Sequence, residues 1–449
     1  MKQAQRQMHL GAFLMETGHH LAAWRHPSVQ ANAGTSLQAY VALAQSAERA
    51  CFDAIFLADN VAANLAPGAH RAARSDRLDP LTLLPALAAV TQRIGLVATA
   101  TTSYNEPYHI ARKFATLDHL SGGRAGWNLV TSDNAAEAEN FNRSSHFAHA
   151  ERYARAHEFH QVVTGLWDSW GDNSFVRDQA NGVYYDPATV HTLNHQGRFF
   201  SVKGPLNVPR SPQGWPVVVQ AGASEDGRVL AAQTADVVFT AHPDLKAAQI
   251  FYQDMKARAI AVGRAPESLK IMPGLSVIVG RTEEEAQQRF AELQALIHPE
   301  VGVALLARML GNFDLSAYPI DGPLPDLPLT DSGQRSRQAL LTAMAIDQGL
   351  TIRELYLRIA AGRGHHMVIG TAATVADAMQ HWFEEGAADG FNIMPADLPD
   401  GLTQFCNLVV PELQRRHLFR TRYTGTTLRE HLGLATPQRR PAALAAECH

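Results

Sequence analysis

The sequence predicts an α/β protein, namely a (β/α)8 TIM barrel with insertions. Within its 449 residues, about eight short apolar segments alternate with segments of helical periodicity. Nearly every predicted strand is followed by a helix, which is the pattern of parallel βα units. Eight such units close most naturally into a barrel. An open doubly wound sheet is the alternative, but no GxGxxG motif follows the first strand.

The predicted strands are short apolar runs, several of which end in a polar side chain. They are expected at residues 8–15, 54–59, 94–101, within 121–143, and at 215–221, 236–241, 269–280 and 390–394. The helices between them begin with recognisable start signals, such as Ser36 as an N-cap, Asp79-Pro80, and Thr282 followed by three glutamates. They are expected at 36–50, 79–91, 106–120, 149–167, 222–234, 243–262, 282–296, 374–385 and 401–418.

Two segments interrupt this alternation. Residues 168–213 look irregular, and residues 299–364 lose the βα rhythm around a proline-rich stretch at 319–328. We interpret the second segment as an insertion or lid. The prediction is a single domain over residues 1–449, with insertions at about 168–213 and 299–364 and a loose tail at about 436–449.

Composition limits the classes of function. The formal net charge is -4, and hydrophobic and charged residues make up 46% and 18% of the chain, as in globular enzymes. We expect no nucleic-acid partner, because no basic tract occurs. We also expect no membrane attachment and no signal segment, since a span needs about 20 apolar residues. The 3 cysteines fit a reducing cytoplasm, and the 21 histidines show no HExxH-like spacing, so no metal is expected.

Polar residues cluster after the predicted fourth strand, in SGGRAGWNLVTSDNAAEAENFNR at residues 121–143. A strand that presents polar groups from its C-terminal end has this pattern. A strand followed by a helix capped by Ser132 or Asp133 fits the same residues. In a barrel, the C-terminal strand ends meet at one mouth. This gives Asp59, Thr101, Asn128 and Ser224 a common location.

A second cluster, Gly222 to Gly227, follows a predicted strand and enters a helix. Small residues at a helix N-terminus suit a phosphate. The alternative is that Ser224 is an ordinary N-cap, followed by two acids in the first turn. His149 and Tyr153 lie four residues apart and so share one helix face, where packing is the simpler interpretation. Trp24 and Arg25 follow a loop with two histidines and are candidates for binding an aromatic or anionic substrate, with a solvated loop as the alternative.

Several kinds of catalytic machinery are missing from the sequence. It contains no GxSxG elbow and no paired-carboxylate pattern typical of glycoside hydrolysis. A barrel mouth that offers amides, hydroxyls and a phosphate site instead suggests a bound cofactor that performs the chemistry.

Five sequence stretches are distinctive when taken together. They are GGRAGWNLVTSDNAAEAENF, FLAD at 56–59, NEPYHIARKFATLDHLSGGR at 105–124, QAGAS at 220–224 and DGFNIMP at 389–395. With these stretches the chain resembles the nitrilotriacetate and dibenzothiophene-sulfone monooxygenases, a branch of the bacterial-luciferase-like FMN-dependent monooxygenases. The similarity runs from about residue 8 to 422.

This resemblance implies a two-component monooxygenase. Reduced FMN would come from a separate NAD(P)H:flavin reductase and react with O2 to a flavin hydroperoxide, which oxygenates a small sulfur- or nitrogen-containing organic substrate. A homodimer or homotetramer is expected. Two alternatives remain: a deazaflavin- or flavin-dependent oxidoreductase that transfers hydride without oxygen insertion, and a non-catalytic flavin-binding homologue.

The resemblance also implies roles for individual residues. Asp59 and Thr101, or Thr102 in its place, would lie near the isoalloxazine, and Asn128 beside the ring or ribityl chain. The ribityl-phosphate end would contact His149, Tyr153, Ser224 and the backbone of Ala223. On the substrate side, His20 is the candidate catalytic residue because an imidazole can donate a hydrogen bond to a bound hydroperoxide, with Trp24 and Arg25 as substrate-binding residues.

Overall fold

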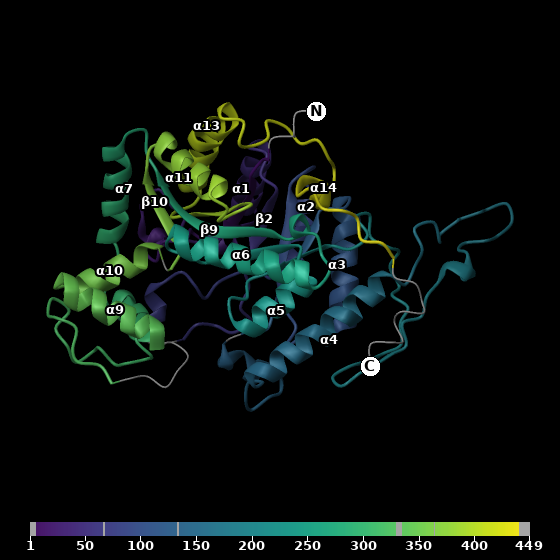
Figure 1. The fold of residues 1–449 in the computed structure, drawn as a ribbon, viewed down its shortest axis with the longest axis horizontal. Helices are drawn as coiled ribbons and strands as arrows, with labels where there is room; N and C mark the ends of the chain where they lie inside the picture. The colour runs from purple at the N-terminus through teal and green to yellow at the C-terminus, as the bar shows by residue number, and fades with distance from the viewer. Residues whose placement is uncertain (1–5, 66–67, 133, 329–334, 363, 440–449) are drawn as a thin grey trace.

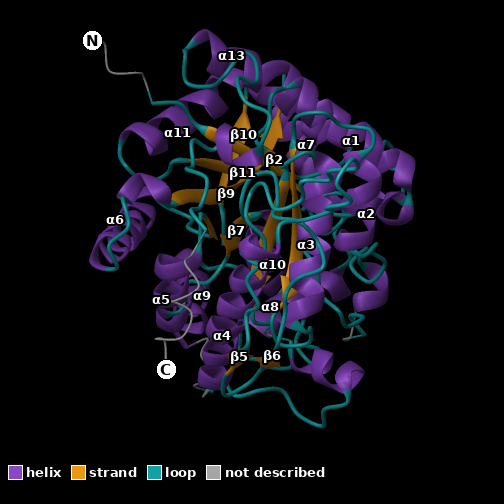
Figure 2. Cartoon of the chain, turned by 90° about the vertical axis from the view of Figure 1, so that its right-hand side faces the viewer, coloured by secondary structure: helices purple, strands orange, loops and turns teal. Residues whose placement is uncertain are grey.

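The computed structural model describes residues 6–65, 68–132, 134–328, 335–362 and 364–439 (Figure 1). Its centre is a ring of eight parallel strands, closed because β8 pairs with β9 and β11 pairs with both β9 and β1. Helices surround these strands (Figure 2). The predicted (β/α)8 barrel is therefore confirmed. Its strands are β1 (His9–Leu14), β2 (Ala54–Leu57), β3 (Gly95–Thr101), β4 (Ala125–Val130), β7 (Val217–Gln220), β8 (Val237–Thr240), β9 (Lys270–Val279) and β11 (Gly390–Pro395).

One strand that pairs with the barrel sheet is not evident from the sequence pattern. β10 (His366–Gly370) lies outside the ring and pairs in parallel with the C-terminal half of β9. Only two of its five residues, Val368 and Gly370, are buried. Its sequence therefore lacks the continuous apolar run of the barrel strands, which are buried on both faces.

The helices begin where the capping signals predicted. Ser36, Asp79 and Thr282 each accept a hydrogen bond from the backbone N–H three residues later. The helices that alternate with the strands are α1 (Leu37–Arg49), α2 (Pro80–Ala88), α3 (Pro107–Ser121), α4 (His149–Trp167), α5 (Glu225–Thr234), α6 (Leu245–Ala261), α7 (Glu283–Ala295) and α11 (Ala372–Glu384). The predicted last helix consists of α12 (Asp400–Gln404), a π-helical turn (Phe405–Val409) and α13 (Val410–Arg415).

A short C-terminal helix, α14 (Leu428–His431), closes the N-terminal end of the barrel and was not predicted. Leu428 and Leu432 pack into an apolar cluster with inward-facing strand residues such as Val97 and Val217. A Cβ at Gly95, the first residue of β3, would lie 2.5 Å from Leu428. Because this end is filled, the site must lie at the opposite, C-terminal mouth.

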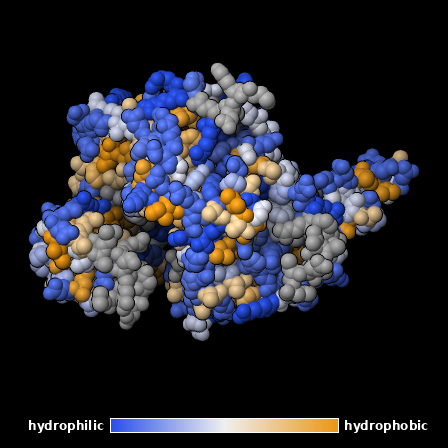
Figure 3. Space-filling model, viewed as in Figure 1, coloured by the Kyte–Doolittle hydropathy of each residue, from blue (hydrophilic) through white to orange (hydrophobic). Residues whose placement is uncertain are grey.

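Residues 168–213 form the first insertion, which contains the small hairpin of β5 (His195–Gln196) and β6 (Ser201–Val202). Part of this insertion, coloured blue-teal, projects from the barrel as an extended arm (Figure 1). Hydrophobic side chains lie on its surface (Figure 3). Val176, Tyr184 and Tyr185 are among the exposed apolar residues of the segment.

The C-terminal tail, predicted to be loose over 436–449, is described only as far as residue 439. Arg439 donates hydrogen bonds to the carbonyls of Asp168 and Thr189, and the carbonyl of Pro437 accepts one from Arg210. The described part of the tail thus contacts the first insertion, and residues 440–449 lie outside the described structure.

The second insertion carries three helices, α8 (Pro299–Met309), α9 (Arg335–Gln348) and α10 (Ile352–Gly362). They share an apolar core of their own that includes Leu306, Leu341 and Tyr356, and Ala22 from the first βα loop packs into it. The segment forms a small helical layer attached to the barrel. Its proposed role as a lid remains a prediction.

No single helix among the described residues has the length and apolarity to cross a membrane. Helices α7 and α8 pass that test only as a pair, with a bend of 90° between them. Within the same described residues, His, Cys, Asp and Glu side chains form no group of three or more that could hold a metal ion.

Candidate active site

A cavity of about 610 Å³ lies at the C-terminal ends of β2, β3, β4 and β7. Its wall includes Asp59 after β2, Thr101 at the end of β3, Ser132 after β4 and Ser224 after β7. Parallel strands deliver all their C-terminal ends to the same mouth, which explains why residues so distant in sequence meet here. The predicted residues Asp59, Thr101, His149, Tyr153, Ala223 and Ser224 all line this cavity.

One end of the cavity is formed by the N-terminus of α5. Ser224 caps this helix, because its hydroxyl accepts a hydrogen bond from Gly227 N at 3.2 Å. The phenol of Tyr153, from α4, lies 3.1 Å from the same hydroxyl. A Cβ at Gly222 would come within 2.9 Å of Gly227 Cα, so the turn before the helix fits only without a side chain there. The result is a tight turn that leads directly into the positive end of the helix dipole.

The two acids in the first turn of α5 each contact a basic side chain. Arg258 donates to both oxygens of Glu225, at 2.7 and 3.0 Å. Asp226 lies 3.0 Å from His149 Nδ1, on the same face of α4 as Tyr153. Both carboxylates thus have basic partners, which weakens the objection that acids at this position would repel a phosphate.

Arg152 is a site residue that the sequence pattern did not reveal, although it lies between His149 and Tyr153 in the chain. Its guanidinium lines the cavity and donates to the carbonyl of Ser132. Its buried Nε atom has no hydrogen-bond partner among the described residues. An unpartnered buried donor beside a cavity indicates a missing ligand. Spacing could have indicated this residue, because Arg152 lies three residues after His149 and therefore shares a helix face with it.

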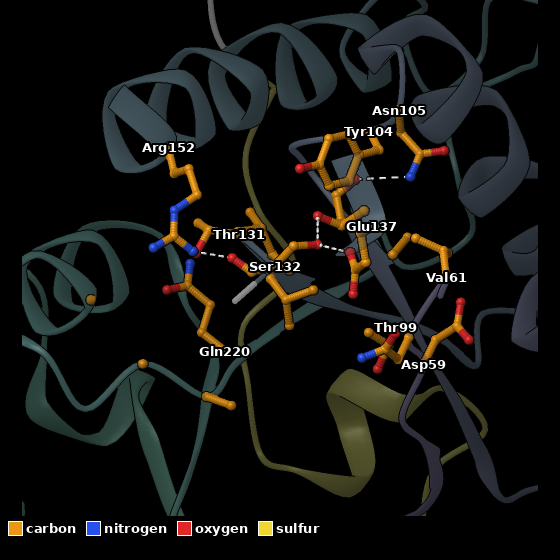
Figure 4. Close-up of a pocket in the computed structure, with 18 of the residues that line it drawn as sticks. Asp59, Val61, Thr99, Tyr104, Asn105, Thr131, Ser132, Glu137, Arg152 and Gln220 are labelled. Atoms are coloured by element: carbon orange, nitrogen blue, oxygen red, sulfur yellow. Dashed lines mark hydrogen bonds between the residues drawn. The ribbon is translucent and has the colours of Figure 1, made fainter. Parts of the chain in front are cut away.

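Asp59 follows β2 and lies across the cavity from Arg152 (Figure 4). Burial raises the pKa of its carboxyl group, and the nearby Asp79 carboxylate adds to this effect. Burial disfavours the charged form, and a second negative charge does the same. The side chain is therefore easier to protonate than an exposed aspartate.

The structure distinguishes Thr101 from Thr102. Thr101 lines the cavity, whereas the hydroxyl of Thr102 is fully buried and donates to the carbonyl of Val130. Asn128 is buried directly behind this wall, where its Nδ2 donates to Thr99 Oγ1 at 2.8 Å. Its Oδ1 has no hydrogen-bond partner among the described residues, and Asn128 is not among the residues that line the cavity.

Beyond β4, the structure differs from the capped helix considered as an alternative. A 3-10 helix (Ala135–Phe141) follows, and its N-cap is Asn134. The Ser132 hydroxyl instead contacts Thr101 and Glu137, and Asp133 lies outside the described residues.

Tyr104 and Glu137, neither of which was predicted from the sequence, line the same part of the cavity. Burial raises the pKa of Tyr104, and the charge of Glu137 raises it further.

The three residues predicted on the substrate side are engaged elsewhere. Among the described residues that line the cavity, His20, Trp24 and Arg25 do not occur. His20 is 4% exposed and contacts Gln294, and burial lowers its pKa to about 4. The Trp24 indole donates to the carbonyl of Arg71, and Arg25 donates to the carbonyl of Leu296 at the end of α7. This loop therefore packs against the C-terminal end of α7, and its Ala22 packs against the second insertion.

Comparison with known proteins assigns this geometry to a family. The family described as "Luciferase-like monooxygenase" matches residues 15–389. The chain belongs to the luciferase-like monooxygenase family. It is 51% identical to N-acetyl-S-(2-succino)cysteine monooxygenase of Bacillus subtilis (strain 168), over 98% of this chain and 100% of that protein. It is 49% identical to nitrilotriacetate monooxygenase component A of Aminobacter aminovorans, over 97% and 98% of the two chains.

Other members of the luciferase-like family confirm the resemblance seen in the motifs. Dibenzothiophene-sulfone monooxygenase of Rhodococcus erythropolis (strain XP) is 43% identical over 97% of this chain and 98% of that protein. The crystal structure of a long-chain alkane monooxygenase superposes with a TM-score of 0.86 at 35% identity, covering 98% and 100% of the two chains. The chain is thus a monooxygenase of the luciferase-like family, an oxidoreductase that incorporates oxygen.

Luciferase-like monooxygenases generally use a flavin, and the structure of one relative is described with bound flavin. A riboflavin lyase described with modified FMN and riboflavin has a TM-score of 0.84 at 34% identity, covering 98% and 99% of the two chains. By contrast, an F420-dependent secondary alcohol dehydrogenase shares only the fold, with a TM-score of 0.57 at 13% identity over 90% and 98% of the chains.

The residues of the cavity fit a flavin mononucleotide. The tight Gly222–Gly227 turn and the start of α5 suit a phosphate, and the unpartnered Arg152 Nε supplies a further donor in the same cavity. Toward β2 and β3, Asp59 and Thr101 offer polar groups to a ring system. One end of the cavity therefore suits an anionic group and the other suits a heteroaromatic ring, as FMN requires.

Proposed function

We propose that this chain is the oxygenase component of a two-component FMN-dependent monooxygenase. It takes reduced FMN from a separate NAD(P)H:flavin reductase, uses O2 as co-substrate, and oxygenates a small sulfur- or nitrogen-containing organic compound. Two relatives support a system with more than one protein, because the nitrilotriacetate enzyme is named a component and another relative, at 46% identity, is named as one of the subunits of pristinamycin IIA synthase.

The observation that carries this proposal is the cavity of about 610 Å³ at the barrel mouth, which has a tight glycine turn and a helix N-terminus at one end. Its volume is within the usual range for small-molecule and cofactor sites. The Ser224 hydroxyl and the Tyr153 phenol meet at the N-terminus of α5, where an anion is favoured, and Arg152 of α4 lines the same cavity.

In this proposal, Ser224, Tyr153 and Arg152 hold the phosphate, and the backbone around Ala223 approaches it closely. Asp59 and Thr101 contact the isoalloxazine, and Asn128, with its unpartnered Oδ1, faces the ring or ribityl chain from behind Thr99. Reduced FMN, when bound, supplies the electrons for activating O2.

The protein must also exclude bulk water so that reducing equivalents reach the substrate rather than solvent. The second insertion, with α8, α9 and α10, is the proposed lid for this purpose. It is connected to the His20 loop through Gln294 of α7, which contacts His20 and donates to the carbonyl of Leu357 in α10. A role for His20, Trp24 and Arg25 toward the substrate then requires this loop to rearrange on closure, because their side chains contact other parts of the chain in this structure.

The names of relatives suggest the chemical class of substrate. A relative at 51% identity is named for an S-substituted cysteine, one at 49% for nitrilotriacetate and one at 43% for a sulfone. All three names denote compounds with an electron-rich or oxidised heteroatom, sulfur or nitrogen, bound to carbon. We therefore propose a substrate of this kind.

The test is to supply the purified protein with FMN, NADH and a flavin reductase and to screen sulfur and nitrogen compounds under ¹⁸O2. We expect one ¹⁸O atom in the product and oxygen consumption that depends on both FMN and the chain. Turnover with reduced deazaflavin but without oxygen incorporation would contradict the proposal. Flavin binding without turnover of any compound would favour the non-catalytic alternative.

A further inference from the structure

A second, smaller cavity lies inside the barrel. It has a volume of about 40 Å³ and is called the inner cavity below, while the cavity of about 610 Å³ at the mouth is called the outer cavity. Every barrel strand except β4 contributes to its lining. Most of the lining residues are apolar and belong to the cluster that fills the barrel interior, for example Val97, Val217 and Val237.

Side chains close the inner cavity at both ends of the barrel. At the N-terminal end, Leu428 and Leu432 line it. Toward the mouth it is lined by Phe56 and Phe239, the penultimate residues of β2 and β8, whose ring centroids lie 5.9 Å apart. Phe13, the penultimate residue of β1, packs edge-on against both rings, at 4.8 and 5.7 Å. These three phenylalanines form an aromatic roof between the inner cavity and the barrel mouth.

The inner cavity is a poor site for water. Its lining contains two residues with polar side chains, Asp53 and Asn392. Asp53 Oδ2 accepts a hydrogen bond from Leu10 N at 2.7 Å. Its Oδ1 contacts His9 and Arg420. A water would find Asn392, whose Oδ1 has no hydrogen-bond partner among the described residues, as its single available polar residue, whereas a buried water typically makes about three hydrogen bonds.

One layer of side chains separates the inner cavity from the outer cavity. On β3, Val97 lines the inner cavity and Thr99 lines the outer one. Residues two apart on a strand share a face and lie about 7 Å apart. On β7, Val219 lines the inner cavity and the next residue, Gln220, lines the outer one. A very small molecule thus has only a short distance to travel between the two cavities.

The size and the lining of the inner cavity select one class of ligand. Its volume of about 40 Å³ is far below the range of about 300–1,000 Å³ that is usual for sites of organic ligands. A charged or hydrogen-bonding molecule would lose its contacts with water there. An apolar gas loses little on leaving water, and dry apolar cavities take up such molecules. Dioxygen, the co-substrate of the proposed reaction, belongs to this class.

We propose that the inner cavity binds dioxygen and delivers it through the aromatic roof to the outer cavity. The inference rests on the proposed function, because that function consumes O2. By this route O2 reaches the reduced flavin from the barrel interior while the cofactor and the substrate occupy the mouth. A side chain that fills the inner cavity should therefore slow the reaction with O2 and leave the affinity for flavin unchanged.

Xenon is the probe for the cavity itself, because it enters dry apolar cavities. Wild-type crystals under xenon pressure should show a xenon atom beside Val97, Val217 and Val237. Val217→Leu places one more methylene in the cavity and should weaken xenon binding at least about fivefold, as measured by ¹²⁹Xe NMR. Val218→Leu is the matched control, because Val218 is the next residue of β7, is also buried and belongs to the core on the other face of the strand. It should bind xenon like wild type.

The second measurement is the reaction with O2. The anaerobic complex with reduced FMN is mixed with O2 in a stopped-flow instrument. The second-order rate constant should fall about fivefold in Val217→Leu and stay within about twofold of wild type in Val218→Leu, with the Kd for reduced FMN within about twofold in both. Near-UV circular dichroism checks folding. If Val217→Leu does not fold, Val237→Leu decides, with its buried neighbour Val238→Leu as control.

Two failures can be told apart. A wild-type protein that binds reduced FMN but holds no xenon in the inner cavity, or holds ordered water there instead, would overturn only this inference. An O2 rate constant that stays at the wild-type value in a Val217→Leu variant that has lost xenon binding would overturn it as well. A wild-type protein that does not bind reduced FMN would overturn the proposed function, and this inference with it, whatever the result with xenon.

Discussion

Replacing Ser224 by alanine separates the structural role of this residue from its proposed role in binding phosphate. The hydroxyl caps α5 through Gly227 N and contacts the Tyr153 phenol. Loss of a serine N-cap costs about 1 kcal/mol of folding stability. Loss of a hydrogen bond to a charged phosphate costs about 1.5–3 kcal/mol more in binding. We therefore expect a Kd for FMN that is about 10- to 100-fold higher.

Two comparisons make this test specific. Riboflavin lacks the phosphate, so its Kd should change less than about threefold in Ser224→Ala. Ser36→Ala removes an equivalent serine cap from α1, where the hydroxyl accepts from Ala39 N at 3.3 Å. This control should lose a similar amount of stability and keep wild-type affinity for FMN. Fluorescence quenching by each flavin measures affinity, and urea unfolding measures stability.

Two results of the Ser224→Ala titrations would contradict the assignment of the phosphate site. If the variant binds FMN as tightly as wild type, the start of α5 does not bind the phosphate. If the Kd values for FMN and riboflavin rise by the same factor, the variant has disturbed the ring end of the cavity, and the serine does not recognise phosphate.

Other changes test the glycine turn, the buried histidine and the second insertion. In Gly222→Ala the new Cβ would lie 2.9 Å from Gly227 Cα, so thermal unfolding should show a loss of about 1–3 kcal/mol and FMN binding should weaken. Gly362→Ala, where the nearest atom would lie at 3.7 Å, should be close to neutral. Burial lowers the pKa of His20 from 6.5 to about 4, so the unfolded chain binds more protons between those values and stability falls as pH drops through that window. Between pH 7 and pH 5 this histidine should account for a loss of about 2 kcal/mol, which urea unfolding of His20→Gln should lack; equal pH slopes would contradict it. Shortening the second insertion should raise the peroxide released per reduced FMN consumed, and unchanged release would argue against a lid.

Much of the fold follows from local sequence patterns. Apolar runs and capping residues such as Ser36 and Thr282 act within a few residues, so they fix where helices and strands begin. The parallel topology then requires residues after each strand, such as Asp59 and Ser224, to meet at one mouth. β10 and α14 were missed because short elements with partial burial carry little periodicity.

The barrel and the set of strand ends that line its cavity can be predicted from the sequence alone, because both depend on alternation along the chain. The side chains that reach that cavity are known only from the folded chain. Thr101 and Thr102 are adjacent in sequence and face opposite ways, and Glu137 lines the cavity in contact with Ser132. Arg25 turns instead to the end of α7. Such contacts depend on distances between elements, which packing sets and spacing along the chain does not record.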